Sequence, residues 1–366
     1  MDVKIITTTE EFEEIRGDWD AIYAVDPHAT IFMSWSWIRG WIEGETRKWA
    51  VIGVRPDSAS PFAAFMTLVI SHVPSWVRYR LAVLHMGGHP LSDHTGFVCL
   101  PSVSDKAVAM FARVVDRHFG RWATFYVRDV MDPRVETFLA ALRSDAYTAH
   151  RLPATPVPFM QLPQTWEEYL REYRSRHPSH HHIARKLRKI ERYSDIRVTQ
   201  AGQGDFHSHC ETFLRIHQIR FGQKDEERLR RLRVLFRWCL EGGSLWLAVM
   251  WLGDRPMATL AAFIDKQKRR FATYLCGFDP EFAKFSPGQV LFAYSIRYAI
   301  RESFQEYDFL RGPEDYKYMF GAVDRFNANA FIKPKGLMRA IEGVDRRITR
   351  GIEHLKHATT GRALFG

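Results

Sequence analysis

The sequence predicts an α/β protein built from two domains that each contain a mixed sheet. Three observations support this prediction. The chain has 366 residues, which is long for one domain and suits two domains of roughly 100 to 200 residues each. A pair of apolar segments around a polar turn, the pattern of a β-hairpin, occurs twice. Each pair precedes an amphipathic helix and a strand that ends in charge, so each copy should fold as helix, helix, antiparallel hairpin, strand, helix, strand.

The internal repeat depends on matching segments in the two halves. The predicted hairpins pair residues 49–54 with 62–70 and residues 246–252 with 257–264, around turns rich in Gly, Pro, Asp or Ser. A Gly-Phe pair follows each hairpin, at Gly96 and Gly277, and the later strands end in Arg128 and Arg311. The nearly constant register indicates a duplication, although apolar patterns alone can also match by chance between two α/β domains.

A proline-rich segment predicts the boundary between the copies. Pro153, Pro156, Pro158 and Pro163 fall within residues 150–165, and proline interrupts regular structure. We therefore expect an N-terminal domain over residues 1–155, a C-terminal domain over residues 156–335 and a basic amphipathic helix over residues 336–366. This last helix has an apolar stripe beside its arginines, so it packs on a domain, covers a partner or lies on an anionic membrane as a peripheral contact.

Composition excludes several classes of protein. The start of the chain is acidic, unlike a secretory signal, and no apolar run approaches the roughly 18 residues that span a bilayer. The longest apolar run, residues 62–70, predicts a buried strand. The four cysteines are far apart and form no Cys-x-x-Cys pair, which favours reduced thiols over a disulfide framework or a zinc site. These features predict a globular cytoplasmic protein.

The charge distribution favours an anionic partner. The net charge is +10, and much of the excess falls in residues 171–197, 228–237 and 339–362. A helix predicted over residues 179–193 has a basic outer face, which is either solvated or a docking strip for the phosphates of coenzyme A, a carrier protein or RNA. Four histidines precede or begin this helix, at positions 177, 180, 181 and 182. They lack a carboxylate or cysteine at ligand spacing, so we expect no metal site.

Ser286-Pro287-Gly288 predicts the start of a helix, with Ser286 as cap and Pro287 in the first turn. The free N–H groups and the positive end of the helix dipole suit a pyrophosphate, although an ordinary cap has the same pattern. The strand over residues 306–310 ends near Asp308 and Arg311, where open α/β sheets bind ligands. Asp308 is therefore either a general base or an ion-pair partner of Arg311.

Several motifs carry a resemblance to a known family, in the family's order. They are the tryptophan-rich segment 34–41, the Ser-Asp pair 92–93, the basic segment 185–192, His217-Gln-Ile-Arg220, Gly277-Phe-Asp279, Ser286-Pro-Gly288 and the run Asp308 to Lys317. From Trp35 to about Phe320 the chain resembles the CelD-like GNAT acetyltransferases of cellulose and exopolysaccharide biosynthesis, which are related to the Fem-type transferases. The resemblance implies a tandem, Fem-like GNAT fold, an acyl-CoA donor, with acetyl-CoA the first candidate, and an amine acceptor that attacks the thioester directly in a ternary complex.

The resemblance also implies a site. It places the donor pantetheine between two strands that part beside residues 274–277 and 307–311. The implied catalytic residues are Asp308 as base, Tyr316 as acid, and Lys317 or Arg311 as the cation that holds a phosphate or carboxylate. The implied donor-binding residues are Tyr274, Gly277, Lys284, Ser286, Gly288, Gln289 and Arg311. The implied acceptor-binding residues are Trp37, Asp93, His217, Arg220 and Glu314, although His217 and Arg220 could also form a solvated pair on one helix face.

Alternatives stay open at this level. The glycine-rich pyrophosphate loop that is usual in GNAT enzymes is reduced to Lys284-Phe-Ser-Pro-Gly288, so a carrier protein or a charged tRNA could present the acyl group instead. For transfer from acyl-CoA, the first function considered, the expected acceptor is a small or sugar-linked amine, and a nucleic acid is the less favoured partner. The alternative functions are Fem-type aminoacyl transfer from tRNA and a non-catalytic GNAT-like module in polysaccharide assembly. The sequence leaves the oligomeric state open.

Overall fold

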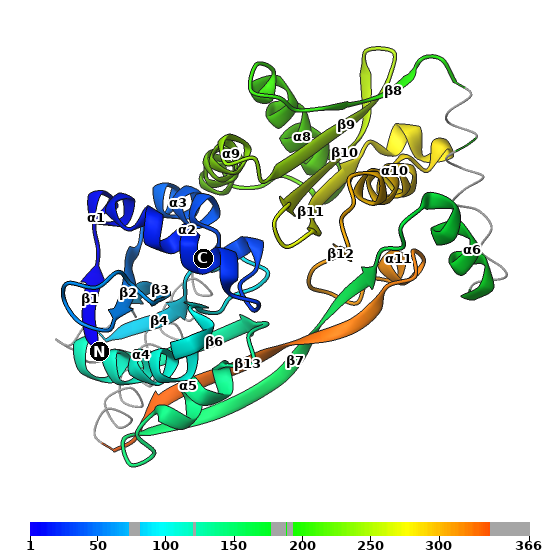
Figure 1. The fold of residues 1–366 in the computed structure, drawn as a ribbon. Coiled ribbons are helices and arrows are strands. Elements are labelled where there is room, and N and C mark those ends of the chain that lie inside the picture. Colours follow the sequence, from blue (N-terminus) through cyan, green and yellow to red (C-terminus); the bar gives the residue numbers. More distant parts are fainter. Residues whose placement is uncertain (73–80, 120–121, 177–187, 189–192, 337–366) are drawn as a thin grey trace, which may run out of the picture. The chain divides into compact units, whose positions relative to one another are not determined.

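The computed structural model describes residues 1–72, 81–119, 122–176, 188 and 193–336 (Figure 1). The chain divides into two compact units. Unit 1 comprises Met1–Ala29, Thr46–Ala154 and the chain from Ala328 onward. Unit 2 comprises Thr30–Glu45 and Thr155–Asn327.

Unit 1 contains one mixed sheet and its covering helices. In chain order its elements are β1 (Asp2–Ile6), α1 (Thr9–Glu14), α2 (Arg16–Val25), β2 (Lys48–Arg55), β3 (Ala64–His72), β4 (Ala82–Met86), β5 (Val98–Cys99), η2 (Pro101–Val103), α4 (Ser104–His118), β6 (Trp122–Val130), α5 (Val135–Ala141) and the start of β7 (Tyr147–Gln161). Its strand order is β1-β2-β3-β4-β6, followed by β13 (Val323–Pro334), and β5 pairs with β3. The pairing of β4 with β6 is parallel, and β1-β2-β3-β4 is antiparallel.

Unit 2 repeats this plan. Its elements are η1 (Ile31–Met33), α3 (Trp35–Gly44), α6 (Trp166–Arg176), β8 (Ile196–Gln200), α8 (Phe206–Phe221), α9 (Glu226–Glu241), β9 (Leu245–Leu252), β10 (Arg255–Asp265), β11 (Arg270–Phe278), η3 (Pro280–Phe285), α10 (Pro287–Arg301), β12 (Glu306–Asp308) and α11 (Asp315–Tyr318). Its strand order is β8-β9-β10-β11-β12-β7, and only the pairing of β11 with β12 is parallel among the pairs from β8 to β7.

The two units therefore share one series of elements. The series β1-α1-α2-β2-β3-β4-α4-β6 in unit 1 matches β8-α8-α9-β9-β10-β11-α10-β12 in unit 2. The predicted hairpins are β2–β3 and β9–β10, each antiparallel. The predicted buried strand over residues 62–70 is β3, which is buried along most of its length. The predicted α/β class with two mixed-sheet copies is confirmed.

The proline-rich segment is a strand, and the prediction that it breaks regular structure was wrong. Residues Tyr147–Gln161 form β7, which includes three of the prolines. Proline lacks an N–H but keeps its carbonyl acceptor. The carbonyls of Pro156 and Pro158 accept hydrogen bonds from Gly312 N at 3.0 Å and Phe309 N at 2.9 Å. These prolines therefore still accept hydrogen bonds from the neighbouring chain, although they cannot donate any.

Two segments depart from the contiguous domain boundaries that the sequence suggested. Residues 30–45 belong to unit 2, because α3 packs against α9. The chain from Ala328 belongs to unit 1, because the second part of β13 pairs with β6, with Phe331 opposite Tyr126. One segment of unit 1 ends at Ala154, and the next residue, Thr155, begins a segment of unit 2.

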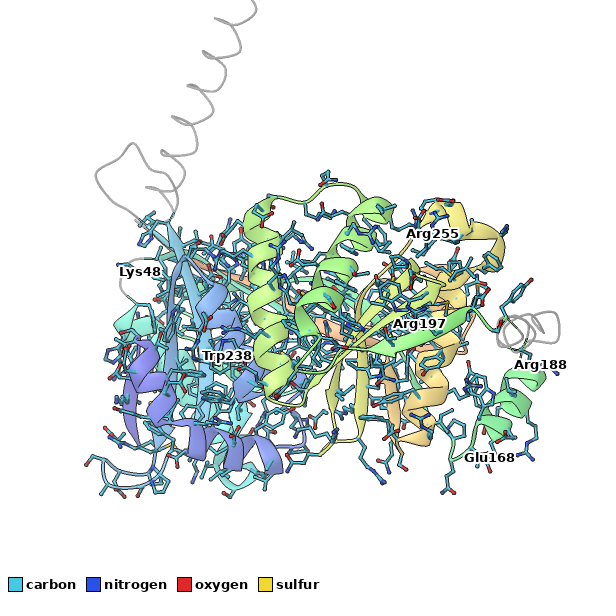
Figure 2. All side chains as sticks on the ribbon, turned by 90° about the horizontal axis from the view of Figure 1, so that it is seen from above. Lys48, Glu168, Arg188, Arg197, Trp238 and Arg255 are labelled. Atoms are coloured by element: carbon cyan, nitrogen blue, oxygen red, sulfur yellow. The ribbon has the colours of Figure 1, made fainter. Side chains whose placement is uncertain are left out.

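The contact between α3 and α9 has no space for an additional methyl group. A Cβ atom on Gly40 would lie 2.9 Å from Trp238 Cβ and 3.2 Å from Leu235 Cα. Figure 2 labels Trp238 on α9, where its ring also receives the Arg39 guanidinium at 4.4 Å. The Trp35 ring contacts the same indole edge-on at 5.8 Å. The glycine therefore sets how closely the two helices approach.

We expect Gly40→Ala to destabilise unit 2 by about 1–3 kcal/mol, because the new methyl group must displace Trp238 and the α9 backbone. Thermal unfolding followed by circular dichroism measures the change. Gly17→Ala is the control, because Gly17 is also helical but has no atom within 4 Å of the added Cβ. That control should stabilise by up to about 1 kcal/mol. Equal melting temperatures for the two variants would contradict the packing argument.

Some predicted segments lie outside the described residues. These are nearly all of the basic helix 179–193, the histidines at 177, 180, 181 and 182, and the C-terminal helix from residue 337. Among the residues that the structure does describe, no helix has both the length and the apolar character to cross a membrane. The four cysteines are all described, and all four are free thiols.

Candidate functional site

Two neighbouring parallel strands of unit 2 part at Asp308. β12 pairs with β11 over three positions, with Ala272 opposite Asp308 at the last one. β11 then continues to Phe278, whereas the chain after β12 turns toward β7, where Phe309 N donates to Pro158 O at 2.9 Å. Figure 1 shows β12 between β11 and β7. The carboxyl ends of these strands therefore diverge at the place where the resemblance implies the donor.

β11 carries a β-bulge just before its free end. Leu275 lies opposite Ala261 of β10, but Thr273 lies opposite the next residue, Ala262, so Tyr274 is the additional residue. The Tyr274 ring lies 4.8 Å from that of Phe263 and 6.3 Å from that of Phe236. This predicted donor-binding side chain is therefore part of an aromatic cluster between β10, β11 and α9.

Helix α8 lies directly against the free end of β11. A Cβ atom on Gly277 would lie 2.8 Å from His217 Cα and 3.0 Å from Ile216 O. Because both are backbone atoms of α8, the glycine is required for this close approach. Its role in the structure is helix–strand packing. The neighbouring carbonyl of Cys276 accepts a hydrogen bond from His217 Nδ1 at 2.9 Å.

His217 and Arg220 lie on α8 beside β11. The His217 side chain is buried, and burial lowers the pKa of its imidazole, with the cations Lys224 and Arg228 acting in the same direction. The Arg220 guanidinium lies over the Phe278 ring, 5.0 Å from its centroid. The two residues are therefore not both solvated, because His217 is buried, whereas Arg220 is exposed and lies over the last residue of β11.

The loop after β12 is held by Asp308. One carboxylate oxygen of Asp308 accepts from Leu310 N at 2.7 Å, and the other forms an ion pair with Arg325 of β13. Leu310 and Gly312 adopt left-handed backbone conformations, with φ of 61° and 104°. A side chain on Gly312 would also meet the Glu314 carboxylate. Asp308 therefore fixes the first turn of the loop.

Lys317 closes the same loop from its other end. Its ammonium group donates to the carbonyls of Leu310 at 2.9 Å, Arg311 at 2.7 Å and Gly312 at 3.0 Å. It also pairs with the Glu314 carboxylate at 2.9 Å. The Lys317 side chain is only 3% exposed, and an ammonium group has three donors. Lys317 is thus committed to the loop backbone in this structure.

Two neutral side chains lie near this loop. Burial raises the pKa of the Cys276 thiol to about 11, although Arg220 and Lys317 act to lower it. Burial also raises the pKa of the Tyr316 hydroxyl far above its ordinary value. At neutral pH both groups keep their protons, so Cys276 is a poor nucleophile, and Tyr316 can act as a proton donor.

α10 begins at the predicted residue, with Ser286 at its N-cap position. Pro287 is in the first turn, and Ser286 makes no capping hydrogen bond with its side chain. Ser286 therefore occupies the predicted N-cap position but does not cap the helix through its hydroxyl, because it ends η3 in a left-handed conformation, with φ of 50°, rather than the extended one that side-chain caps use. A Cβ atom on Gly288 would make only an ordinary contact, 3.4 Å from the Phe278 ring. The first turn of α10 is therefore open at Gly288.

Comparison with known proteins identifies the fold. Residues 174–318 match the family model of the acetyltransferase (GNAT) domain. The structure of a tandem GNAT protein from the clavulanic acid biosynthesis pathway has a TM-score of 0.51 at 11% identity, covering 92% of this chain and 99% of that chain. This chain has a GNAT-type acyltransferase fold.

Other solved structures share this GNAT fold. FemX has a TM-score of 0.60 at 11% identity, covering 90% of this chain and 97% of that chain. L-PGS from Bacillus licheniformis has a TM-score of 0.51 at 10% identity, covering 93% of this chain and 96% of that chain. At such identities the likeness extends to the fold alone. No curated protein matches the sequence.

The other predicted site residues lie in different parts of the structure. Trp37 is fully buried against Phe32 and Phe263, so its predicted contact with an acceptor is corrected to a role in the core of unit 2. Asp93 lies in unit 1. Lys284 is exposed at the end of η3, and Gln289 is half-buried in the first turn of α10. Arg311 and Glu314 lie in the loop that Lys317 closes.

Sequence reasoning missed two contributors to the candidate site. Arg325 pairs with both Glu306, at 2.8 Å, and Asp308. It lies on β13, a strand that the sequence pattern did not predict. Thr273 Oγ1 donates to Asp308 O at 3.1 Å where the strands begin to part. A polar residue in an otherwise apolar strand was the only available signal for Thr273. Within the described ranges, no group of side chains is arranged to hold a metal ion.

Proposed function

We propose that unit 2 binds an acyl-CoA where β11 and β12 part and transfers its acyl group to an amine, as the resemblance to CelD-like enzymes implies. The observation that supports this proposal most is the divergence of the two strands after Asp308, beside the open first turn of α10. The pantetheine arm would lie along the free end of β11, whose backbone groups can hydrogen-bond to its amides. Acetyl-CoA is the first candidate donor.

The first turn of α10 suits the donor's pyrophosphate. Its N–H groups and the positive end of the helix dipole favour an anion, and Gly288 leaves the backbone accessible. Arg220 and Lys284 supply positive charge from α8 and η3. The Tyr316 hydroxyl, which keeps its proton at neutral pH, is the proposed proton donor to the leaving thiolate.

Acetyl-CoA calorimetry with two variants of Gly288 tests this proposal. Gly288→Glu should weaken binding by about tenfold or more, because a carboxylate beside the pyrophosphate repels it. The same substitution should leave the melting temperature unchanged or raise it, because an acidic group stabilises a helix N-terminus. Gly288→Ala is the matched control and should bind like the wild type, since its Cβ has space. If neither the wild type nor the control binds any acyl-CoA, the proposal is wrong.

A Fem-type reaction, aminoacyl transfer from charged tRNA, is the second candidate. The fold likeness to FemX supports it, as does the replacement of a glycine-rich phosphate loop by the short helix η3. Binding of aminoacyl-tRNA at physiological salt, without binding of acyl-CoA, would favour this reaction. Absence of both would favour a non-catalytic module in polysaccharide assembly. We propose a cytoplasmic location and a small or sugar-linked amine as acceptor.

A further inference from the structure

The two ring nitrogens of His217 have different surroundings. Nδ1 lies 2.9 Å from the carbonyl oxygen of Cys276. A carbonyl oxygen can only accept a hydrogen bond, so Nδ1 must carry a proton. In the neutral ring Nε2 then holds the lone pair. Nε2 has no hydrogen-bond partner among the described residues, so its lone pair is available to a ligand.

The ring is held firmly in this orientation. It stacks on Phe213 at 5.9 Å with an interplanar angle of 8°, and it contacts Phe221 at 4.9 Å. Its backbone is fixed against β11, because only a glycine at position 277 permits the approach of α8. The residue is 5% exposed. A group that is already oriented loses little entropy when it reacts.

His217 also lies beside the part of β11 that β12 leaves free. Its partner Cys276 comes after Ala272, the last residue of β11 that pairs with β12. We propose that His217 is the general base of the acyl transfer and takes a proton from the acceptor's ammonium group at Nε2. This inference rests on the proposed function.

The other candidate bases are less suited. The Asp308 oxygens accept from Leu310 N and pair with Arg325. The Glu314 carboxylate pairs with Lys317. The Cys276 thiol keeps its proton, since burial raises its pKa to about 11. Compared with these three groups, His217 is the better proton acceptor at pH 7, because its imidazole is neutral and its Nε2 has a lone pair.

The surroundings keep His217 neutral. Burial acts first to lower its pKa, and two cations act in the same direction, Lys224 before α9 and Arg228 in α9. The hydrogen bond to Cys276 O opposes these effects. A base that is unprotonated at neutral pH is ready to receive a proton.

The proposed step balances. An N–H bond of the ammonium breaks, and its proton moves to Nε2. The freed lone pair forms the C–N bond at the thioester carbonyl carbon. The C–S bond breaks, and its electron pair leaves with sulfur as a thiolate. The second amine proton is lost as the amide forms, the thiolate gains one proton, and His217 releases the other to solvent. The products are an amide, free coenzyme A and one proton.

The test compares two histidines of the same helix. His217→Asn keeps an N–H donor near the Nδ1 position but removes the base. His209→Asn is the control, since His209 is also buried in α8 but bonds Thr199 Oγ1 through Nε2 at 2.8 Å. Free thiol release from acetyl-CoA is measured with a panel of amino sugars and amino acids. We expect His217→Asn to lower kcat by about 10²- to 10⁴-fold, with unchanged acetyl-CoA affinity and loss of the acid limb of the pH profile. The control should retain activity and pH profile.

A second measurement needs no activity. Nitrogen-15 NMR of the histidines, with His217→Asn for assignment, reports the tautomer and the pKa in the intact protein. We expect the Nδ1–H tautomer at pH 7 and titration below 6.5, the ordinary histidine value. An Nε2–H tautomer, or full kcat in His217→Asn, would overturn the inference. If acetyl-CoA does not bind to the wild type, the proposed function fails by that result, whereas the tautomer still decides whether His217 can be the base.

Discussion

Arg325→Met should destabilise unit 2 by about 3 kcal/mol and weaken acetyl-CoA binding. Arg325 pairs with two buried carboxylates of β12, Glu306 and Asp308. Removal of one partner of a buried ion pair leaves a charge in a site of low polarity, which costs roughly 3–5 kcal/mol. The expected loss lies at the low end, because Arg325 is 21% exposed and Glu306 also lies 3.7 Å from Arg270. Chemical denaturation and calorimetry measure the two effects.

The matched control for this substitution is Arg301→Met. Arg301 pairs with Glu302 at 3.1 Å, but its side chain is 68% exposed. An exposed pair contributes at most about 1 kcal/mol. If the two methionine variants lose equal stability, the buried network on β12 is not what holds this part of unit 2. Unchanged acetyl-CoA affinity in Arg325→Met would show that Asp308 does not need its guanidinium partner to shape the loop.

Much of the fold could be predicted from local patterns. The hairpins β2–β3 and β9–β10 are long, apolar and separated by turn residues, so their signal lies within a few residues. β1 and β8 could not be predicted in the same way, because each has five residues and is mostly half-buried. β7 was not predicted because it contains prolines, although two of these prolines still accept hydrogen bonds through their carbonyl groups. In each case the deciding partner lies far away in the sequence.

The assignment of residues 30–45 to unit 2 could not be predicted from local patterns either. The apolar face of α3 predicts that the helix packs against another element, but the sequence of α3 does not indicate that this element is α9. The identity of the partner depends on Gly40, which matches Trp238 in shape only once both helices exist. Shape complementarity between distant residues is a property of the folded chain.

The candidate site was predicted in part. The run from Asp308 to Lys317 was singled out by its resemblance to a family motif, and in the structure Lys317 bonds three carbonyls within it. The chemical roles within the run are harder to predict, because they depend on partners. Asp308 has Arg325 from β13, and His217 has the Cys276 carbonyl from β11. A hydrogen bond to a backbone group cannot be predicted from residue types, because every residue has a backbone carbonyl.

Arg134→Met should destabilise unit 1 by about 3–5 kcal/mol. Its guanidinium bonds Asp132 at 2.6 Å and Asp26 at 2.9 Å, and both carboxylates are fully buried. It also donates to Phe97 O at 3.2 Å. Asp26 in turn accepts from Cys99 N at 2.8 Å, so one side chain connects the end of α2, β5 and the turn before α5.

Rescue and control variants separate charge from packing at this position. Adding Asp26→Asn and Asp132→Asn to Arg134→Met removes both buried charges, so stability should partly return. Arg143→Met is the control, because Arg143 pairs with Asp116 at 2.9 Å and is 59% exposed, which predicts a loss below about 1 kcal/mol. Chemical denaturation ranks the variants. If neutralising the carboxylates recovers nothing, the lost packing of the Arg134 stem, rather than two uncompensated charges, is what destabilises unit 1.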